Sequence, residues 1–183
     1  MRLRLPHAPY VANKIAIDLA KSGFVTLTQG VEPVAKAAQE LIEEDLKKEH
    51  SLEEHVREII EENEDEIEFM LADPKQLFWM IKKRLAPDYD VILNFEDRFN
   101  HLSHKILDRL YEEDLINYSV PENKVKNLIY DAIIGYIKLY DEIEDMVLEK
   151  ISNYKRKLIP GSEEYDLVFQ KLYEDELRKR GML

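Results

Sequence analysis

Apolar residues recur every three or four positions along almost the whole chain, a pattern that predicts amphipathic helices. The first run covers about residues 8–22 and stops at Gly23, because glycine readily adopts the left-handed conformation found after helix ends. A short β-branched run over residues 24–28 predicts a strand-like connection. A second helix of this kind is expected from about residue 97, followed by an extended connection over residues 115–118.

A longer helical stretch follows Pro121, and no proline interrupts its apolar stripe from Val125 to Leu158. We therefore expect one helix of roughly forty residues, about 60 Å long. Ser119 stands where a side chain can cap the first turn, and Thr28 stands at the matching place before the other long stretch. These two residues are the predicted N-caps of the long helices.

The earlier long stretch carries its apolar stripe from Val34 to Met70. Ser51-Leu52-Glu53-Glu54 resembles a helix start, so this helix is expected to restart or bend there. Pro74 and Pro160-Gly161 mark the ends of the two long stretches. A return helix is expected after each break.

The two halves of the chain align at a single offset of 91 residues. Matched positions include Lys14-Ile15 with Lys105-Ile106, Leu19 with Leu110, Val34 with Val125, Ile42 with Ile133, Val56 with Val147, and Phe78 with Phe169. One register that preserves a turn and several helices indicates a tandem duplication. We expect residues 1–88 to form the first repeat and residues 89–183 the second, joined through a linker over residues 87–94.

The predicted fold is all-α, with tandem-duplicated helical units. Helices over about residues 8–50 and 97–140 would form a four-helix bundle base. Hairpins over about residues 51–86 and 141–180 would project from it as two arms related by pseudo-two-fold symmetry. A compact bundle is the alternative architecture.

The charge of the chain is concentrated in one segment. The net charge is −12, and between Glu40 and Asp73 fifteen acidic residues accompany three basic ones. A surface of this kind repels a phosphate backbone, so we expect no DNA partner. We favour a solvated helix face as its role.

Composition excludes several classes of site. The chain has no cysteine, which excludes disulfides, thiolate metal sites and a cysteine nucleophile. Charged residues make up 35% of the chain, and together with the lack of cysteine this composition is typical of adaptation to heat. No segment has the length of a membrane span and no secretion signal is visible, so we expect a cytoplasmic protein with no membrane partner.

Three stretches of the sequence resemble one bacterial family. They are Arg4-Leu5-Pro6-His7-Ala8-Pro9-Tyr10 with the following Lys14-Ile15-Ala16-Ile17-Asp18-Leu19, then Lys75-Gln76-Leu77-Phe78-Trp79-Met80-Ile81-Lys82-Lys83, and Tyr154-Lys155-Arg156-Lys157-Leu158-Ile159-Pro160-Gly161. The chain is similar over essentially its whole length to the domain-of-unknown-function family numbered five hundred and seven. This resemblance implies a bacterial protein and transfers no catalytic residue, because the family has no established activity.

Candidate chemistry is sparse. His101 and His104 share a helix face with Asp97 and Asp108, so a metal site is geometrically feasible, although ordinary surface ion pairing is favoured. The many carboxylates lie on polar faces, and none is marked by the pattern as buried with a raised pKa. Because the sequence has no glycine-rich phosphate loop and no nucleophile motif, we predict no catalytic residue and no cofactor.

Aromatic residues suggest a binding surface instead. Phe78-Trp79-Met80-Ile81 places four large apolar residues in succession, and one helix face cannot bury all four. We favour an arm core with a partly covered Trp79, and we expect Tyr136 and Tyr140 where the base gives way to an arm. The favoured hypothesis is a non-enzymatic binding or scaffold protein. Its inter-arm cleft would hold an unknown protein or small-molecule partner against Trp79, Tyr136 and Tyr140.

Two other functions remain as alternatives. The first is a metal-dependent enzyme that uses His101 and His104. The second is an RNA- or ribosome-associated factor that uses the basic clusters Lys82-Lys83-Arg84 and Lys155-Arg156-Lys157. A solvated role is favoured for both clusters, since each can neutralise neighbouring acids and helix C-termini.

Overall fold

The computed structural model describes residues 3–154 and 157–181 of the chain. Its elements in chain order are η1 (Leu5–His7), α1 (Ala8–Lys21), β1 (Val25–Leu27), α2 (Val31–Glu62), α3 (Glu64–Phe69), α4 (Pro74–Leu85), η2 (Ala86–Tyr89), α5 (Phe95–Glu112), β2 (Ile116–Tyr118), α6 (Glu122–Ser152) and α7 (Glu163–Lys179). Helices dominate, so the all-α prediction is confirmed. In both halves a helix, a strand, a long helix and a return helix follow one another.

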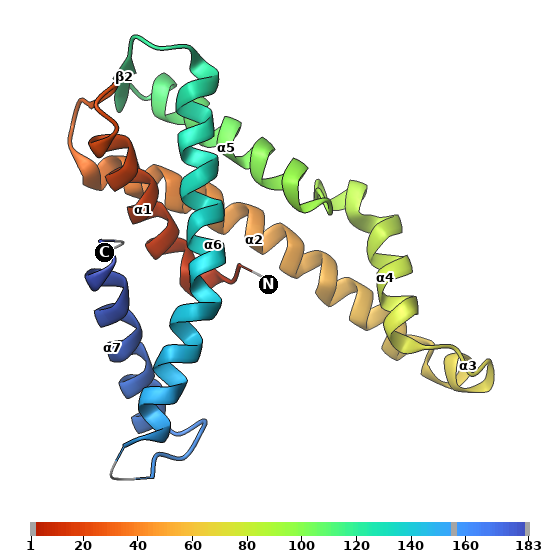
Figure 1. Cartoon of the computed structure of the whole chain (residues 1–183). Coiled ribbons are helices and arrows are strands. Elements are labelled where there is room, and N and C mark those ends of the chain that lie inside the picture. The colour runs from red at the N-terminus through yellow and green to blue at the C-terminus, as the bar shows by residue number, and fades with distance from the viewer. Residues whose placement is uncertain (1–2, 155–156, 182–183) are drawn as a thin grey trace.

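Four helices form the base of a forked molecule (Figure 1). α1 packs against α2 and α6, and α5 packs against the same two long helices. The apolar stripes predicted from the sequence supply the contacts, with Ile15 and Leu19 of α1 and Ile106 and Leu110 of α5 fully buried. The main hydrophobic core therefore draws on both halves of the chain.

The two strands pair with each other across the top of the base. β1 and β2 are antiparallel, and Thr26 lies opposite Asn117. Thr28 was expected to cap the first long helix, but its N–H donates to the carbonyl of Leu115 (3.1 Å) and its hydroxyl donates to the carbonyl of Asp114. The strand pairing thus engages Thr28, and Gly30 is the residue that precedes the helix instead.

The prediction for Ser119 is also wrong, because Pro121 is the residue at the N-cap of α6 and no side chain caps that end. Proline fixes φ near the helical value and lacks the N–H that would go unpaired there. The helix can therefore begin without the serine.

Each long helix extends beyond the base and pairs with a return helix to form an arm (Figure 1). The second half of α2, with α3 and α4, is called arm 1 below, and the second half of α6, with α7, is called arm 2. α2 continues through Ser51 without a restart, and it ends at Glu62 rather than carrying on to Met70. At its end Asn63 Nδ2 donates to the carbonyl of Ile59 (2.7 Å), and the separate short helix α3 follows.

α6 is shorter than expected, because it ends at Ser152 and not near Leu158. Ser152 Oγ donates to the carbonyl of Glu149 (2.7 Å), and the N–H of Tyr154 donates to the carbonyl of Ile151 (3.1 Å). These bonds tighten the last turn and close the helix.

The two arms differ in how their cores connect to the base. Arm 1 has a small cluster of its own, built on the buried residues Leu52, Val56, Ala86 and Val91. In arm 2 the buried residues Ile143, Val147, Ile151, Tyr173 and Leu177 belong to the main core. No helix in the described part of the chain has both the length and the apolar content to cross a membrane.

Candidate functional site

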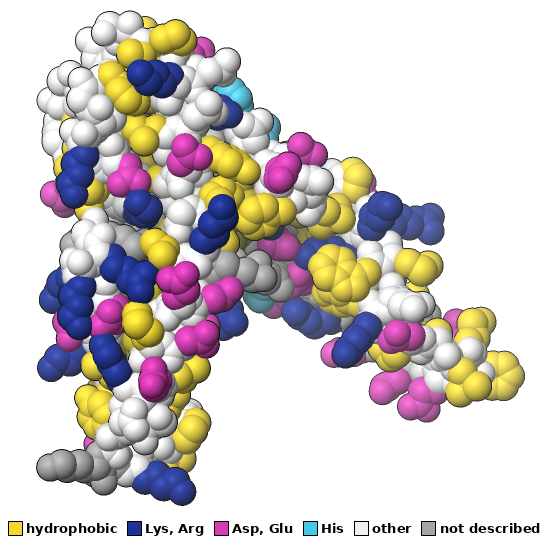
Figure 2. Space-filling model, in the orientation of Figure 1, with side chains coloured by type: hydrophobic (Ala, Val, Ile, Leu, Met, Phe, Trp, Pro, Cys, Tyr) yellow, Lys and Arg dark blue, Asp and Glu magenta, His cyan; other side chains and the backbone are white. Residues whose placement is uncertain are grey.

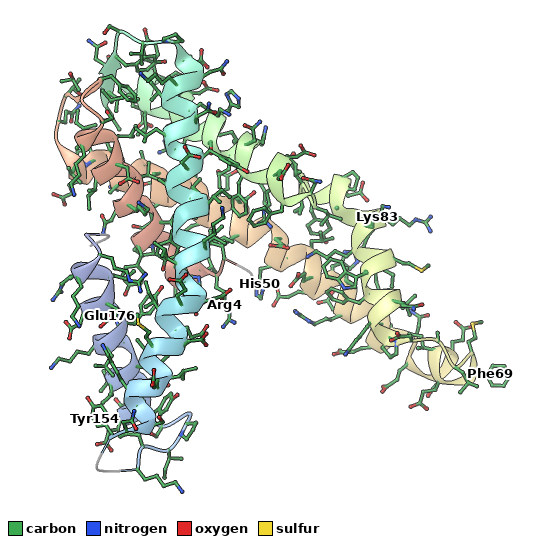
Figure 3. The ribbon with its side chains drawn as sticks, viewed as in Figure 1. Arg4, His50, Phe69, Lys83, Tyr154 and Glu176 are labelled. Carbon is green, nitrogen blue, oxygen red and sulfur yellow. The ribbon has the colours of Figure 1, made fainter. Side chains whose placement is uncertain are left out.

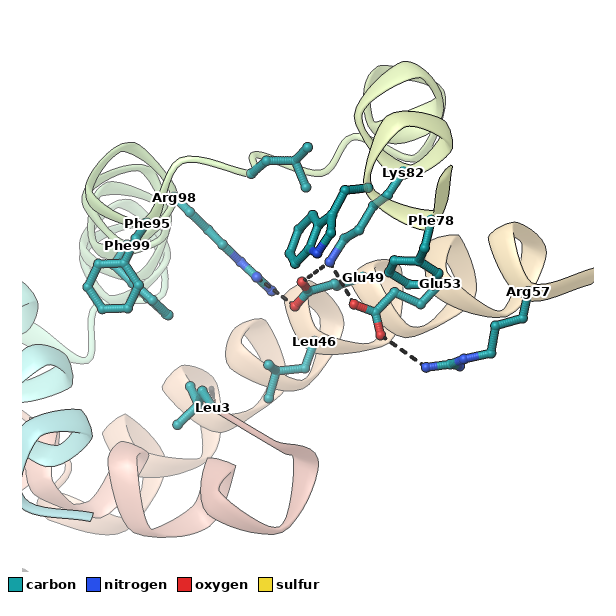
Figure 4. A pocket seen from close by; sticks show the side chains of 12 residues that line it. Leu3, Leu46, Glu49, Glu53, Arg57, Phe78, Lys82, Phe95, Arg98 and Phe99 are labelled. Carbon is teal, nitrogen blue, oxygen red and sulfur yellow. Dashed lines mark hydrogen bonds and ion pairs between the residues drawn. The ribbon is translucent and has the colours of Figure 1, made fainter. Parts of the chain in front are cut away.

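A groove of about 600 Å³ lies at the root of arm 1 (Figure 4). Its walls come from α2, α4, α5, the linker before α5 and the segment before η1. The lining residues are Leu3, Leu46, Glu49, Glu53, Arg57, Phe78, Trp79, Lys82, Leu93, Phe95, Arg98 and Phe99. This arm-1 groove brings together parts of the chain that are far apart in the sequence.

A buried cation stands at the floor of the arm-1 groove. Lys82 is only 2% exposed, and its Nζ lies 2.7 Å from Glu49 Oε1 and 2.6 Å from Glu53 Oε1. Lys82 projects from α4, and the two carboxylates lie one turn apart on α2 (Figure 4). A buried charge needs such partners, because an isolated one is far too costly to take out of water.

Two arginines extend these ion pairs to either side. Arg98 on α5 donates from Nη1 to Glu49 Oε2 (2.6 Å) and from Nε to Asp45 Oδ2 (2.8 Å). Its Nη2 lies 2.7 Å from the same Asp45 oxygen, as an ion pair without hydrogen-bond geometry. Arg57 Nη2 lies 3.5 Å from Glu53 Oε2. Three cations and three carboxylates thereby connect α2, α4 and α5, and the set is called the ionic floor below.

The electrostatics of the ionic floor keep the carboxylate of Glu49 charged. Burial alone would raise the pKa of Glu49, but the ammonium of Lys82 and the guanidinium of Arg98 outweigh it and hold the pKa at about 2. Burial likewise opposes the charge of Arg98, and Asp45 and Glu49 raise its pKa above the ordinary value. A general acid or base needs a pKa near the working pH, so Glu49 is suited to ion pairing and not to proton transfer.

The buried carboxylates were missed in the sequence, although a signal for them exists. Glu49 and Glu53 continue the three-and-four spacing of the apolar stripe from Ile42 and Leu46. An acid at a stripe position is buried only with a partner, and Lys82 holds the corresponding inward position of α4. The sequence pattern does not show which residue of another helix pairs with these carboxylates.

The rim of the arm-1 groove is aromatic and open to solvent. Trp79 is 61% exposed, and Lys82 Nζ lies 5.1 Å from its ring centroid. Phe95 and Leu93 are also exposed beside it. Of the four successive apolar residues noted in the sequence, Phe78 and Ile81 pack on the core of arm 1, while Trp79 and Met80 face solvent.

The structure does not bring Tyr136 and Tyr140 into the arm-1 groove. Tyr136 is 1% exposed, and its hydroxyl oxygen lies 2.6 Å from that of Tyr173 in the main core. Tyr140 is buried, with its ring centroid 4.2 Å from that of His7. Tyr140, His7 and Tyr173 line a different pocket, of about 470 Å³, at the root of arm 2. The expected grouping with Trp79 is therefore corrected: packing of the tyrosines into the core separates them from that residue.

The histidines proposed for a metal site lie on α5, where His101 is exposed and His104 is half-buried. His101 faces a narrow pocket beside Asp45, Asp90 and Lys105. Among residues 3–154 and 157–181, no group of three or more His, Asp or Glu side chains is arranged to hold a metal ion. Within those ranges, His101 and His104 therefore belong to no such group.

The structure exposes only part of the basic clusters on which the RNA hypothesis depends. Lys82 is enclosed by the carboxylates of α2, so it is unavailable to a phosphate backbone. Only Lys83 and Arg84 of that cluster are exposed. Lys155 and Arg156 lie outside the described residues.

Taken together, these features define a predominantly helical, forked protein with an aromatic groove over a balanced ionic floor. The chain belongs to the family described as protein of unknown function (DUF507), which matches residues 1–182. No curated protein matches the chain. Since the family has no assigned activity, a function has to be argued from the arm-1 groove itself.

Proposed function

We propose that this chain is a non-enzymatic binding or scaffold protein whose working surface is the arm-1 groove, on the side of arm 1 that faces the segment before η1. The observation that carries the proposal is the exposure of Trp79 above the ionic floor. Tryptophan and arginine dominate the energy of protein interfaces, and a covered tryptophan is a typical anchor. Here Trp79, Arg57 and Phe95 line one concave surface.

The electrostatics of the arm-1 groove favour binding over catalysis. Lys82 and the carboxylates around it neutralise one another, and Glu49 stays ionised far below neutral pH. Such a cluster holds α2, α4 and α5 in a fixed geometry, which is what an interface requires of the surface beneath it. The aromatic rim then remains available to a partner.

We also propose that the two halves of the chain, residues 1–88 and 89–183, descend from a tandem duplication and are related by a pseudo-two-fold axis. Thr26 pairs with Asn117, its own equivalent at the 91-residue offset, as a two-fold axis through the strand pair requires. The buried residues of α1 also coincide with those of α5 at this offset. They are Ala8, Val11, Ala12, Ile15, Ala16 and Leu19 against Phe99, Leu102, Ser103, Ile106, Leu107 and Leu110.

The same offset relates the arm-1 groove to the pocket at the root of arm 2. Asp45, Glu49, Lys82 and Arg98 correspond to Tyr136, Tyr140, Tyr173 and His7, so charged residues in one half stand where aromatic rings stand in the other. Trp79 corresponds to Gln170. This divergence supports separate roles for the two sites, with the tryptophan anchor in arm 1 alone.

Photo-crosslinking tests the proposed surface. A photoreactive phenylalanine derivative would replace Trp79 in the full chain, produced in its natural cells, and Leu167 would be the control position because it is 62% exposed on α7. We expect an adduct from position 79 that does not form from position 167. Excess purified chain should compete for the adduct. Identical products from both positions, or none from position 79, would refute the proposal.

A further inference from the structure

The far end of arm 1 exposes apolar side chains that nothing in the described chain covers. In residues 61–73, called the acidic tip below, Phe69 is 89% exposed and Leu71 is 92% exposed, with Met70 exposed between them. Phe69 projects from the end of the arm (Figure 3), and apolar side chains gather at the same end in the space-filling view (Figure 2). Three successive large apolar residues on a projecting hairpin are typical of a contact surface.

Leu71 occupies a backbone conformation that glycine would adopt more easily. Its φ is +52°, and the N–H of Ala72 donates to the carbonyl of Ile67 (3.2 Å) around it, as at many helix ends. An L-residue is less stable in this region than in a right-handed conformation, because its Cβ crowds the following carbonyl oxygen. The chain therefore keeps an exposed leucine where glycine would relieve the cost.

The charges of the acidic tip and of the arm-1 groove are complementary. The acidic tip carries seven acidic residues, and no Lys or Arg occurs between Arg57 and Lys75. The mouth of the arm-1 groove carries Arg57, whose side chain is 53% exposed, and it adjoins a second pocket lined by Arg4. Arg4 lies in the angle between the two arms (Figure 3). An apolar, acidic protrusion and an apolar groove bordered by guanidinium groups are thus both present on one molecule.

The acidic tip, which includes α3, lies at the free end of arm 1 and points away from the base (Figure 1), whereas the arm-1 groove is lined by residues of α2, α4 and α5. Two copies with their first arms antiparallel would place each tip at the groove of the other copy. That arrangement repeats one contact twice around a two-fold axis, which closes the assembly at two copies.

We propose that the occupant of the arm-1 groove is the acidic tip of a second copy of this chain, bound reciprocally. The inference rests on the proposed function of the groove and names its partner. Phe69 and Leu71 would cover Trp79 and Phe95, while the tip carboxylates would approach Arg57 and Arg4. The apolar contacts supply most of the affinity, and the charges set the orientation and make the association sensitive to salt.

Sedimentation and fluorescence of the full chain test this directly. Trp79 is the only tryptophan in the sequence, so its emission reports on the groove alone. We expect the mass to rise from one to two copies with concentration, accompanied by a blue shift of the emission, and added salt should weaken both. A chain that stays monomeric with constant emission would overturn the inference.

Matched variants separate the two halves of the contact. Leu71→Gly removes the side chain and relieves the positive φ, so it should weaken dimerisation at least about tenfold without lowering thermal stability. Arg57→Glu should also weaken dimerisation, from the groove side, and Leu167→Ala on arm 2 should leave dimerisation unchanged. When the Leu71→Gly and Arg57→Glu chains are mixed, the intact tip of the second can bind the intact groove of the first. One of the two contacts should therefore be restored, and a mixed dimer should form. No mixed dimer, or a Leu71→Gly dimer of undiminished strength, would contradict the reciprocal arrangement.

Two further outcomes distinguish the inference from the proposed function. If the adduct from position 79 has the mass of two copies, both stand. If the chain is monomeric and position 79 captures a different protein, the groove is a binding surface but the second copy is not its partner. Binding of the tip to phosphatidylcholine vesicles, with or without phosphatidylglycerol, that Leu71→Gly abolishes would instead assign the tip to lipid and overturn the inference.

Discussion

Lys82 is a single cation shared by two buried carboxylates, and the stability of arm 1 depends on it. Replacing it in Lys82→Met keeps the length of the side chain but takes one cation away from both Glu49 and Glu53, which keep their ion pairs with Arg98 and Arg57. We expect the free energy of unfolding to fall by about 3–5 kcal/mol, the usual cost of removing one partner of a buried ion pair. Chemical denaturation measures this change.

The control for this variant removes the carboxylates as well. Adding Glu49→Gln and Glu53→Gln to Lys82→Met also removes the two carboxylates that lost this cation, so most of the lost stability should return. If Lys82→Met cost less than about 1 kcal/mol, the pair would behave as an exposed one. The burial described for Lys82 would then be contradicted.

Two buried titratable residues predict how stability depends on pH. Burial, with a smaller contribution from Arg4, lowers the pKa of His7 from 6.5 to about 4. As the pH drops, the unfolded chain therefore binds a proton at His7 before the folded chain does. The free energy of unfolding should fall by about 3 kcal/mol between pH 6.5 and pH 4. Glu49, with its pKa held at about 2 in the fold, should then lose its contribution as the pH falls from about 4.5 to 2.

Denaturation curves across the pH range resolve the two steps. The variant His7→Phe should lack the upper step and retain the lower one, because only the first depends on the imidazole. An upper step that persists in His7→Phe would show that His7 is not its source. The value for His7 would then be wrong.

At the scale of elements, the sequence predicts helices well where apolar periodicity is long and unambiguous. α1 begins and ends almost as expected, since its stripe is complete and Gly23 follows it with φ at +77°. Both short extended links are strands. Local periodicity and one glycine are sufficient for these elements.

The ends of the long helices were harder to predict, because contacts elsewhere decide them. Thr28 looks like a helix cap, yet its hydroxyl is engaged by Asp114 from the other half of the chain. Asn63 and Ser152 end α2 and α6 by bonding to carbonyls of the preceding turn, although the apolar pattern continues past both residues. Periodicity reports which face is apolar, and it does not report where the backbone turns away.

The candidate site was predicted in part. Exposure of Trp79 follows from the run of four apolar residues, since a helix has one buried face. The burial of Tyr136 and Tyr140 and the ion pairs of Lys82 depend on which helices meet, and no local pattern states that. A residue of mixed character, such as tyrosine or lysine, takes its role from its neighbours in the fold.

At the scale of the whole molecule, the two arms are joined to the base by different physical means. Between the core of arm 1 and the main core stand the charged residues of the ionic floor. At the root of arm 2 the corresponding positions are aromatic, and the main core continues through Tyr136 and Tyr173 into the arm. Apolar continuity couples arm 2 to the base more strongly than ion pairs couple arm 1, because part of the ion-pair energy is offset by desolvation.

This asymmetry predicts that arm 1 opens locally while arm 2 opens only with the whole molecule. In native-state hydrogen exchange, amides of α4 and of the end of α2 should exchange through an opening whose free energy lies below that of global unfolding. Amides of α7 and of residues 143–151 should exchange near the global value, since their side chains belong to the main core. Mass spectrometry of the two arms at increasing denaturant compares them within one sample, so each arm is the control for the other. Equal protection of both arms, or earlier exchange in arm 2, would contradict this prediction. It would mean that the ionic floor couples arm 1 to the base at least as strongly as the apolar core couples arm 2.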